Sequence, residues 1–200
     1  AKNIYMRMYY NEGRQTDLEE HAAIDLFNEY FGGGMNGIVF QELREARGLA
    51  YNAASYYLTP SKKGNPEYFF THIITQNDKM MDCIHQFREI LDKLPQSEAA
   101  FQIAKDALTK QMASSRTTKF GVIRAYLSAQ KQGYDYDTNK KIFEDLKNVT
   151  LKDIADFEQK QMAGKTGHYL ILGDEKELDM KSLEEIAPVQ RLSLEEIFGY

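Results

Sequence analysis

Two strand-like segments separated only by a loop constrain the fold of this chain more than any other feature. Residues 49–58 mix small and aromatic side chains, residues 67–76 are rich in aromatic and β-branched ones, and the loop between them contains lysine, glycine and proline. A doubly wound parallel sheet needs strict alternation of strands and helices, and this pair of segments breaks the alternation. The pattern therefore predicts the α+β class, with a mixed, largely antiparallel sheet packed against helices.

The remaining segments add further strands and a set of helices. Strands are expected at 3–10 and 167–173, and the apolar run of the second indicates a buried strand. Thr16 and Glu19 have the spacing of a helix capping box. No repeat or change in composition marks a linker, so residues 1–200 are expected to form a single domain. Amphipathic patterns predict helices over 17–31, 37–46, 79–93, 98–114, 119–132, 139–146 and 151–162.

Composition excludes several classes of protein. The chain has 200 residues, of which 42% are hydrophobic, so it is not globally disordered. Its one cysteine, Cys83, excludes a disulfide scaffold and leaves the localisation open, since a reducing compartment and the periplasm both fit. The net charge of −5 supplies no strongly basic surface, so no nucleic-acid partner is expected. No apolar run reaches the ~20 residues that span a bilayer, so no membrane segment is expected.

Histidine spacing argues against a zinc hydrolase site in this chain. No histidine has a second one within four positions, so neither H-E-x-x-H nor H-x-x-E-H occurs. His85 and Glu89 are four residues apart on a predicted helix and could ligate a metal together, although the ordinary interpretation is a surface pair. Cys83 diverges from His85 on such a helix, which favours a buried thiol over a nucleophile. The histidines are His21, His72, His85 and His168.

A glycine cluster matches a nucleotide-binding pattern only superficially. Gly32, Gly34 and Gly37 fit G-x-G-x-x-G, but that loop binds a pyrophosphate when it follows a strand, and here a helical pattern precedes it. No acidic residue follows at the distance needed for a ribose. The cluster is therefore interpreted as a helix C-terminus and a turn between two helices.

Alternating charges follow the glycine cluster, at the end of the next predicted helix. Arg44 is separated from Tyr51 by a helix end and the start of a strand. A corner of this kind can bring a guanidinium and a phenol together, and both groups can donate hydrogen bonds to the carbonyls of an extended peptide. The alternative is a solvated surface with weak ion pairs, in which Arg47 is structural.

The segment FGGGMNGIVFQELREARGLAYNAASYY, residues 31–57, closely resembles the M16 metallopeptidase family. This family includes pitrilysin, insulin-degrading enzyme, mitochondrial processing peptidase and the core subunits of the cytochrome bc1 complex. The shared pattern is a glycine cluster, a short helix with an aromatic residue before an acidic-Arg-acidic segment, then G-L-A-Y and a strand. The resemblance implies an α+β domain of the M16 peptidase and LuxS-like metallohydrolase type.

The resemblance also implies a two-domain architecture in which one domain is catalytic and the other is not. Family enzymes pair such domains as a clamshell, and one domain of the pair carries H-x-x-E-H and a distal glutamate as the zinc site. The corresponding helix here, DLEEHAAIDLFNEYF, contains His21 alone. The chain thus resembles the non-catalytic partner domain, with no cofactor of its own, zinc in the catalytic partner domain, and a peptide as substrate. It is expected to be the last domain of a larger peptidase or a separate subunit.

The resemblance also implies roles for individual residues, at the positions of this sequence that match the family pattern. Partner domains of active family members supply an Arg and a Tyr seven residues apart that reach the substrate, which implies substrate binding by Arg44 and Tyr51. Gly32, Gly33 and Gly34 lie where the processing peptidase has a longer substrate-contacting loop, and they form a possible substrate loop. Two alternatives remain: a catalytically inactive interaction subunit like the respiratory core proteins, and an independent enzyme that uses His85 and Glu89.

Overall fold

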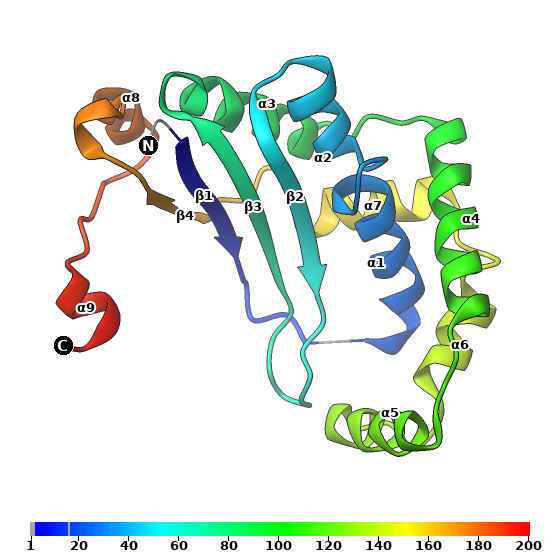
Figure 1. Ribbon diagram of the computed structural model, residues 1–200. Coiled ribbons are helices and arrows are strands. Elements are labelled where there is room, and N and C mark those ends of the chain that lie inside the picture. The colour runs from blue at the N-terminus through cyan, green and yellow to red at the C-terminus, as the bar shows by residue number, and fades with distance from the viewer. Residues whose placement is uncertain (1–2, 16) are drawn as a thin grey trace.

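The computed structural model describes residues 3–15 and 17–200, and four strands form its sheet (Figure 1). These strands, β1 (Asn3–Tyr10), β2 (Ala50–Leu58), β3 (Tyr68–Gln76) and β4 (His168–Leu172), are arranged in the order β2-β3-β1-β4. β2 and β3 pair directly, β1 lies between β3 and β4, and all these pairings are antiparallel. The predicted α+β class is confirmed.

The central strands bury alternate side chains. In β1, Ile4, Met6 and Met8 are buried and the residues between them are exposed. β3 buries Phe69 and Ile73 in the same way. Because successive side chains of a strand point to opposite faces, only one face of the sheet packs against helices and forms the core.

Helices cover the buried face of the sheet and extend to one side of it (Figure 1). The rings of Phe27 and Phe157, from the first and seventh helices, lie 5.7 Å apart, and Phe157 also contacts Tyr57 of β2 at 4.9 Å between ring centroids. The predicted helices from 79–93 to 151–162 agree with α3 to α7 within one residue at each end. The helices are α1 (His21–Phe27), α2 (Ile38–Phe40), α3 (Met80–Asp92), α4 (Glu98–Ser114), α5 (Lys119–Gln132), α6 (Thr138–Asp145), α7 (Leu151–Gln161), α8 (Met180–Ile186) and α9 (Leu194–Phe198).

The helix predicted over 17–31 is a composite of three helical forms. A 3₁₀ turn, Leu18–Glu20, leads into α1, and a π-helical turn, η2 (Asn28–Gly32), follows it. The side chain of Asp17 accepts a hydrogen bond from the backbone N–H of Glu19 at 3.1 Å and caps the start, whereas Thr16 of the predicted capping box lies outside the described residues. The next predicted helix is likewise α2 continued by a π-helical turn, η3 (Gln41–Ala46).

The strand predicted at 167–173 is present as β4, but the prediction that it is buried is wrong. β4 is an edge strand that pairs only with β1. Leu170 and Leu172 are 54% and 71% exposed, while Tyr169 and Ile171 are half-buried. Leu170 and Leu172 pair with Arg7 and Tyr5 of β1, which are also exposed, so they lie on the face of the sheet that the helices leave uncovered. An apolar run does not reveal whether both faces of a strand are covered.

Two helices project from the body of the domain (Figure 1). α5 exposes Phe120 and Ile123, and α9 exposes Leu194 and Phe198. In the described part of the chain, no helix combines the length and apolar character needed to cross a membrane.

Candidate functional site

A tight corner joins the π-helical turn η3 to strand β2. Gly48 has a φ angle of +58°, which side-chain-bearing residues rarely adopt. Its N–H donates to the Arg44 carbonyl at 3.0 Å, and the N–H of Leu49 donates to the Leu43 carbonyl at 2.7 Å. The two bonds are nested, and each spans one residue more than its counterpart in a Schellman motif, which agrees with the π-helical turn before them. Together they end the helix and turn the chain into the strand.

Hydrogen bonds from strand β3 and from the turn after it hold this corner in place. The buried Thr75 hydroxyl donates to the Leu49 carbonyl at 2.6 Å, and the Lys79 ammonium donates to the Gly48 carbonyl at 3.0 Å. These bonds satisfy the carbonyls of the two residues that lead from the helix into the strand. The corner is therefore held by the sheet rather than free to flex.

The corner brings Arg44 and Tyr51 together. The Arg44 guanidinium carbon lies 5.6 Å from the centroid of the Tyr51 ring, within the range of a cation–π contact. Both side chains are open to solvent, with the Arg44 side chain 42% exposed and Tyr51 73% exposed. The sequence pattern suggested this juxtaposition, whereas the substrate-binding role of the pair stays a prediction.

Phe40 belongs to the same cluster, although the sequence analysis assigned it no role in the site. Its ring centroid lies 4.9 Å from the Arg44 guanidinium carbon, and the residue is only 8% exposed. The signal in the sequence was the four-residue spacing of Phe40 and Arg44 on a helix. Nearby, Arg47 donates to a Glu42 carboxylate oxygen at 2.9 Å, which agrees with a structural role for Arg47.

The glycine cluster divides into a packed part and an exposed part. Gly32 is buried against β2, and a Cβ atom there would lie 1.9 Å from the Ser55 carbonyl oxygen. Gly34 has a φ angle of +67° and open space around it, and the neighbouring Met35 is 71% exposed. The substrate-loop role of Gly32, Gly33 and Gly34 stays a prediction, and the accessible part of the loop is the turn at Gly34.

The potential nucleophile and metal ligands lie apart from the corner. Cys83 is fully buried in α3, and burial raises the pKa of its thiol to about 12, so the predicted buried thiol is confirmed. His85 and Glu89 are both exposed on the same helix, and the described residues include no group of three or more His, Cys, Asp or Glu side chains able to hold a metal ion. His21 is 6% exposed, and burial lowers its pKa and favours the neutral ring.

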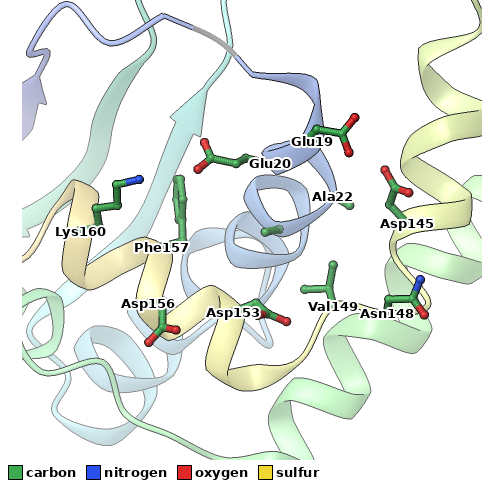
Figure 2. Close-up of a pocket in the computed structure, with 11 residues that line it drawn as sticks. Glu19, Glu20, Ala22, Asp145, Asn148, Val149, Asp153, Asp156, Phe157 and Lys160 are labelled. Carbon is green, nitrogen blue, oxygen red and sulfur yellow. The ribbon is translucent and has the colours of Figure 1, made fainter.

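A surface pocket of about 460 Å³ lies between α1, α6 and α7 (Figure 2). Its lining is acidic, yet several carboxylates already have partners within the protein. Asp145 pairs with Lys141 at 2.9 Å, and Asp153 accepts a hydrogen bond from the Thr150 hydroxyl at 2.7 Å in the capping box of α7. None of the residues that line the pocket belongs to the corner.

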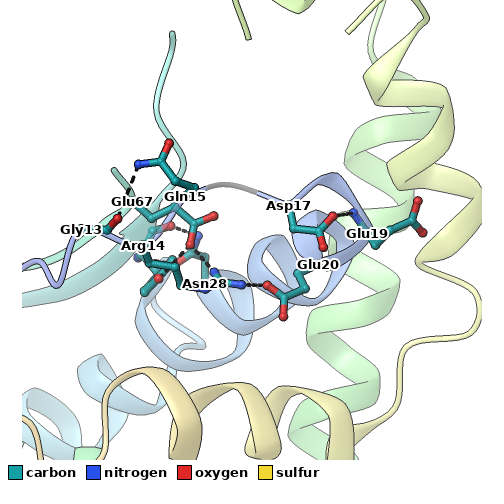
Figure 3. A network of polar contacts seen from close by, with 9 residues as sticks. Gly13, Arg14, Gln15, Asp17, Glu19, Glu20, Asn28 and Glu67 are labelled. Carbon is teal, nitrogen blue, oxygen red and sulfur yellow. Dashed lines mark hydrogen bonds and ion pairs between the residues drawn. The ribbon is translucent and has the colours of Figure 1, made fainter. Parts of the chain in front are cut away.

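A polar network ties the segment after β1 to the sheet (Figure 3). Arg14 pairs with Glu20 and with Glu67, whose side chain is fully buried. The Tyr57 hydroxyl donates to Glu67 at 2.9 Å, and burial raises the pKa of Tyr57 well above its usual value. The Asn28 side chain bonds both backbone groups of Tyr57, at 2.7 and 2.8 Å. This network pairs the buried Glu67 charge with Arg14 through one carboxylate oxygen, while the other oxygen has no hydrogen-bond partner among the described residues. It also covers the edge of β2 at Tyr57, so its role is structural.

Solved structures share this fold. One is a peptidase M16 inactive domain from Pseudomonas fluorescens, with 17% identity and a TM-score of 0.61, and another is a protease from Helicobacter pylori, with 14% identity and a TM-score of 0.71. A third is the inactive peptidase domain of a Bordetella parapertussis protein described as a zinc protease, with 12% identity and a TM-score of 0.69. These similarities cover 86%, 87% and 86% of this chain.

The same similarities cover 40%, 42% and 92% of the three solved chains, so this chain spans well under half of the first two. No curated protein matches it in sequence. Residues 2–108 match the family described as the peptidase M16 inactive domain. Because that match extends over more than half of the sequence, the chain belongs to the peptidase M16 family as one of its inactive domains.

Proposed function

We propose that this domain is the substrate-binding, non-catalytic half of an M16-type zinc peptidase that cleaves peptides inside a clamshell chamber. The zinc ion belongs to a catalytic M16 partner domain, carried on the same polypeptide or on a separate subunit. In this proposal the chain contributes to peptide cleavage through groups that bind and orient the substrate.

The exposed pair of Arg44 and Tyr51 is the observation that carries this proposal. Arg44 has five N–H donors, and its nearest carboxylate oxygen in the described part of the chain, on Glu45, is 3.6 Å from its Nε atom. That distance is too long for a strong hydrogen bond, so the donors are available to an incoming group. The phenol of Tyr51 adds another donor beside them.

Donors in this arrangement suit the carbonyl groups of an extended peptide. A guanidinium and a phenol can hold substrate carbonyls and stabilise the negative charge that develops on the carbonyl oxygen under attack. The rigid corner supports that role, because a preorganised donor loses little free energy to reorganisation when the charge appears.

The uncovered face of the sheet supports the presence of a partner domain. Tyr5 and Tyr9 of β1 are 50% and 36% exposed, and the rings of Tyr9 and Tyr68 lie 5.8 Å apart. Phe70 continues this aromatic row, with its ring centroid 6.2 Å from that of Tyr68. Contiguous apolar surface of this kind is typical of protein interfaces.

Peptide cleavage by the full-length protein, or by this chain together with its catalytic partner, tests the proposal. We expect chelator-sensitive cleavage, and we expect Arg44→Ala to lower kcat/KM about 100-fold, as loss of an oxyanion donor does in other enzymes. Arg124→Ala is the matched control, because Arg124 also lies 4.9 Å from a phenylalanine ring but on the projecting helix α5. Unchanged activity of Arg44→Ala would refute the proposed role.

The sequence of the partner separates this function from the alternative. If neither an upstream segment nor a partner chain carries H-x-x-E-H, the domain is an inactive interaction subunit, as in the respiratory core proteins. In that case Arg44→Ala changes no catalytic rate, and the aromatic face of the sheet remains its functional surface.

A further inference from the structure

We propose that Phe40 is a positioning residue that holds the Arg44 guanidinium ready for the substrate without consuming its hydrogen-bond donors. This inference rests on the proposed function, because it assigns Arg44 to substrate binding. It concerns how the arginine is held, and its test gives a result distinct from that of Arg44→Ala alone.

Two aromatic rings hold the guanidinium. Its central carbon lies 4.9 Å from the Phe40 ring centroid and 5.6 Å from the Tyr51 ring centroid. Both distances fall within the ~6 Å range in which a ring attracts a cation through its electron-rich face. Phe40 is the closer ring and the better anchored one, since it is 8% exposed while Tyr51 is 73% exposed.

The local backbone explains why Phe40 is fixed. It is the last residue of α2, next to the buried Val39, and η3 follows it directly. Arg44 is four residues further along this helical run, so its side chain lies on the same side as the ring. Phe40 is too buried to serve as a substrate contact of its own, which makes it a positioning residue.

The way in which Arg44 is held contrasts with that of two other arginines, Arg47 in the same corner and Arg14 at the far end of strands β2 and β3. Arg47 donates to Glu42 at 2.9 Å, and Arg14 pairs with the buried Glu67, so carboxylates occupy their donors. A carboxylate on Arg44 would compete with the substrate for the same N–H groups. An aromatic ring restricts the motion of the guanidinium without supplying an oxygen acceptor, so the hydrogen bonds remain for the peptide.

A double-mutant cycle in the active protein, with its catalytic half present, tests this inference. We expect Phe40→Leu to lower kcat/KM about two- to fivefold, the range that a cation–π contact at an exposed site supports. We expect Phe40→Tyr, which keeps the ring, to retain activity. In the Arg44→Ala background Phe40→Leu should have no further effect, because the arginine on which it acts is gone.

Phe120→Leu is the matched control for the ring. Phe120 and Arg124 make the same contact at 4.9 Å, also four residues apart, on α5. We expect this variant to leave kcat/KM unchanged. Thermal unfolding of each variant shows whether it is folded, and if Phe40→Leu does not fold, Phe40→Met replaces it in the cycle.

The possible results separate the two proposals. If Arg44→Ala retains full activity, the proposed function fails. If Arg44→Ala loses activity but Phe40→Leu and Phe40→Met are unaffected, or reduce activity by the same factor with and without Arg44, the proposed function stands and this inference is overturned.

Discussion

Gly32→Ala is expected to destabilise the domain strongly, although the change adds a single methyl group. The new Cβ would lie 1.9 Å from the Ser55 carbonyl oxygen and 2.3 Å from the Ser55 hydroxyl oxygen. The nearer obstacle is backbone of strand β2, so the clash cannot be relieved by rotating a side chain. Either η2 or β2 must move.

The size of the effect follows from two contributions. Overpacking a filled site typically costs about 1–3 kcal/mol. Displacement of η2 also strains the paired hydrogen bonds between the Asn28 amide and the Tyr57 backbone, each worth about 0.5–1.5 kcal/mol. The higher helix propensity of alanine opposes these costs by only about 1 kcal/mol. We therefore expect a net loss of roughly 2–4 kcal/mol, most of it from the clash.

Urea unfolding followed by circular dichroism measures this loss. Gly121→Ala is the matched control, because Gly121 lies in the first turns of α5 and its nearest neighbours would be 3.3 Å from the new Cβ, at the side chains of Thr117 and Thr118. We expect that variant to be as stable as the parent or slightly more stable. A midpoint for Gly32→Ala equal to that of the parent would refute the claim that Gly32 is required for the close approach of η2 to β2.

Two further predictions concern stability. Glu158 is fully buried in α7, and burial raises its pKa to about 7, so its contribution to stability is complete below pH 4.5 and is lost as the pH rises through 7. We therefore expect Glu158→Gln to be more stable relative to the parent at pH 8 than it is at pH 5. Urea midpoints of variant and parent that differ by the same amount at both pH values would contradict this. Thr150→Ala removes the capping box of α7 and should lower the free energy of unfolding by about 1 kcal/mol. The control Thr118→Ser keeps the capping hydroxyl of α5 and should change the free energy of unfolding little. Equal thermal midpoints for the two variants would contradict the stabilising role of the Thr150 cap.

Elements with strong local signals were predictable from the sequence. The strands at 3–10 and 67–76 have aromatic and β-branched runs, and helices such as 98–114 have both an apolar period and a capping serine, Ser97. These signals lie within a few residues of each other in the chain, so they depend less on tertiary contacts than other features do. The Arg44–Tyr51 juxtaposition was accessible for the same reason, since a glycine stop between them implies a sharp corner.

Features that depend on contacts distant in the sequence were not predictable. The π-helical turn at Asn28–Gly32 exists beside β2, where Gly32 meets Ser55 and Asn28 bonds to Tyr57. The exposure of Leu170 and Leu172 depends on which face of the sheet the helices cover, because both residues share the open face with Tyr5 and Arg7 of β1. In both cases the sequence pattern is local, whereas the outcome depends on which elements become neighbours.

The corner shows how an inactive domain can retain a precise surface. Its buried layer includes Thr75, Leu43 and Phe40, and the Arg44 guanidinium and the Tyr51 ring extend from it into solvent. Packing fixes the buried residues, and the buried residues restrict the Arg44 and Tyr51 side chains above them. Under the proposed function, these side chains therefore lose little conformational entropy when a peptide binds. A domain whose role is to present donors to a partner's reaction needs this rigidity more than it needs titratable groups. Under the proposed function, the exposed donors at this firmly held corner are the groups that contact the peptide.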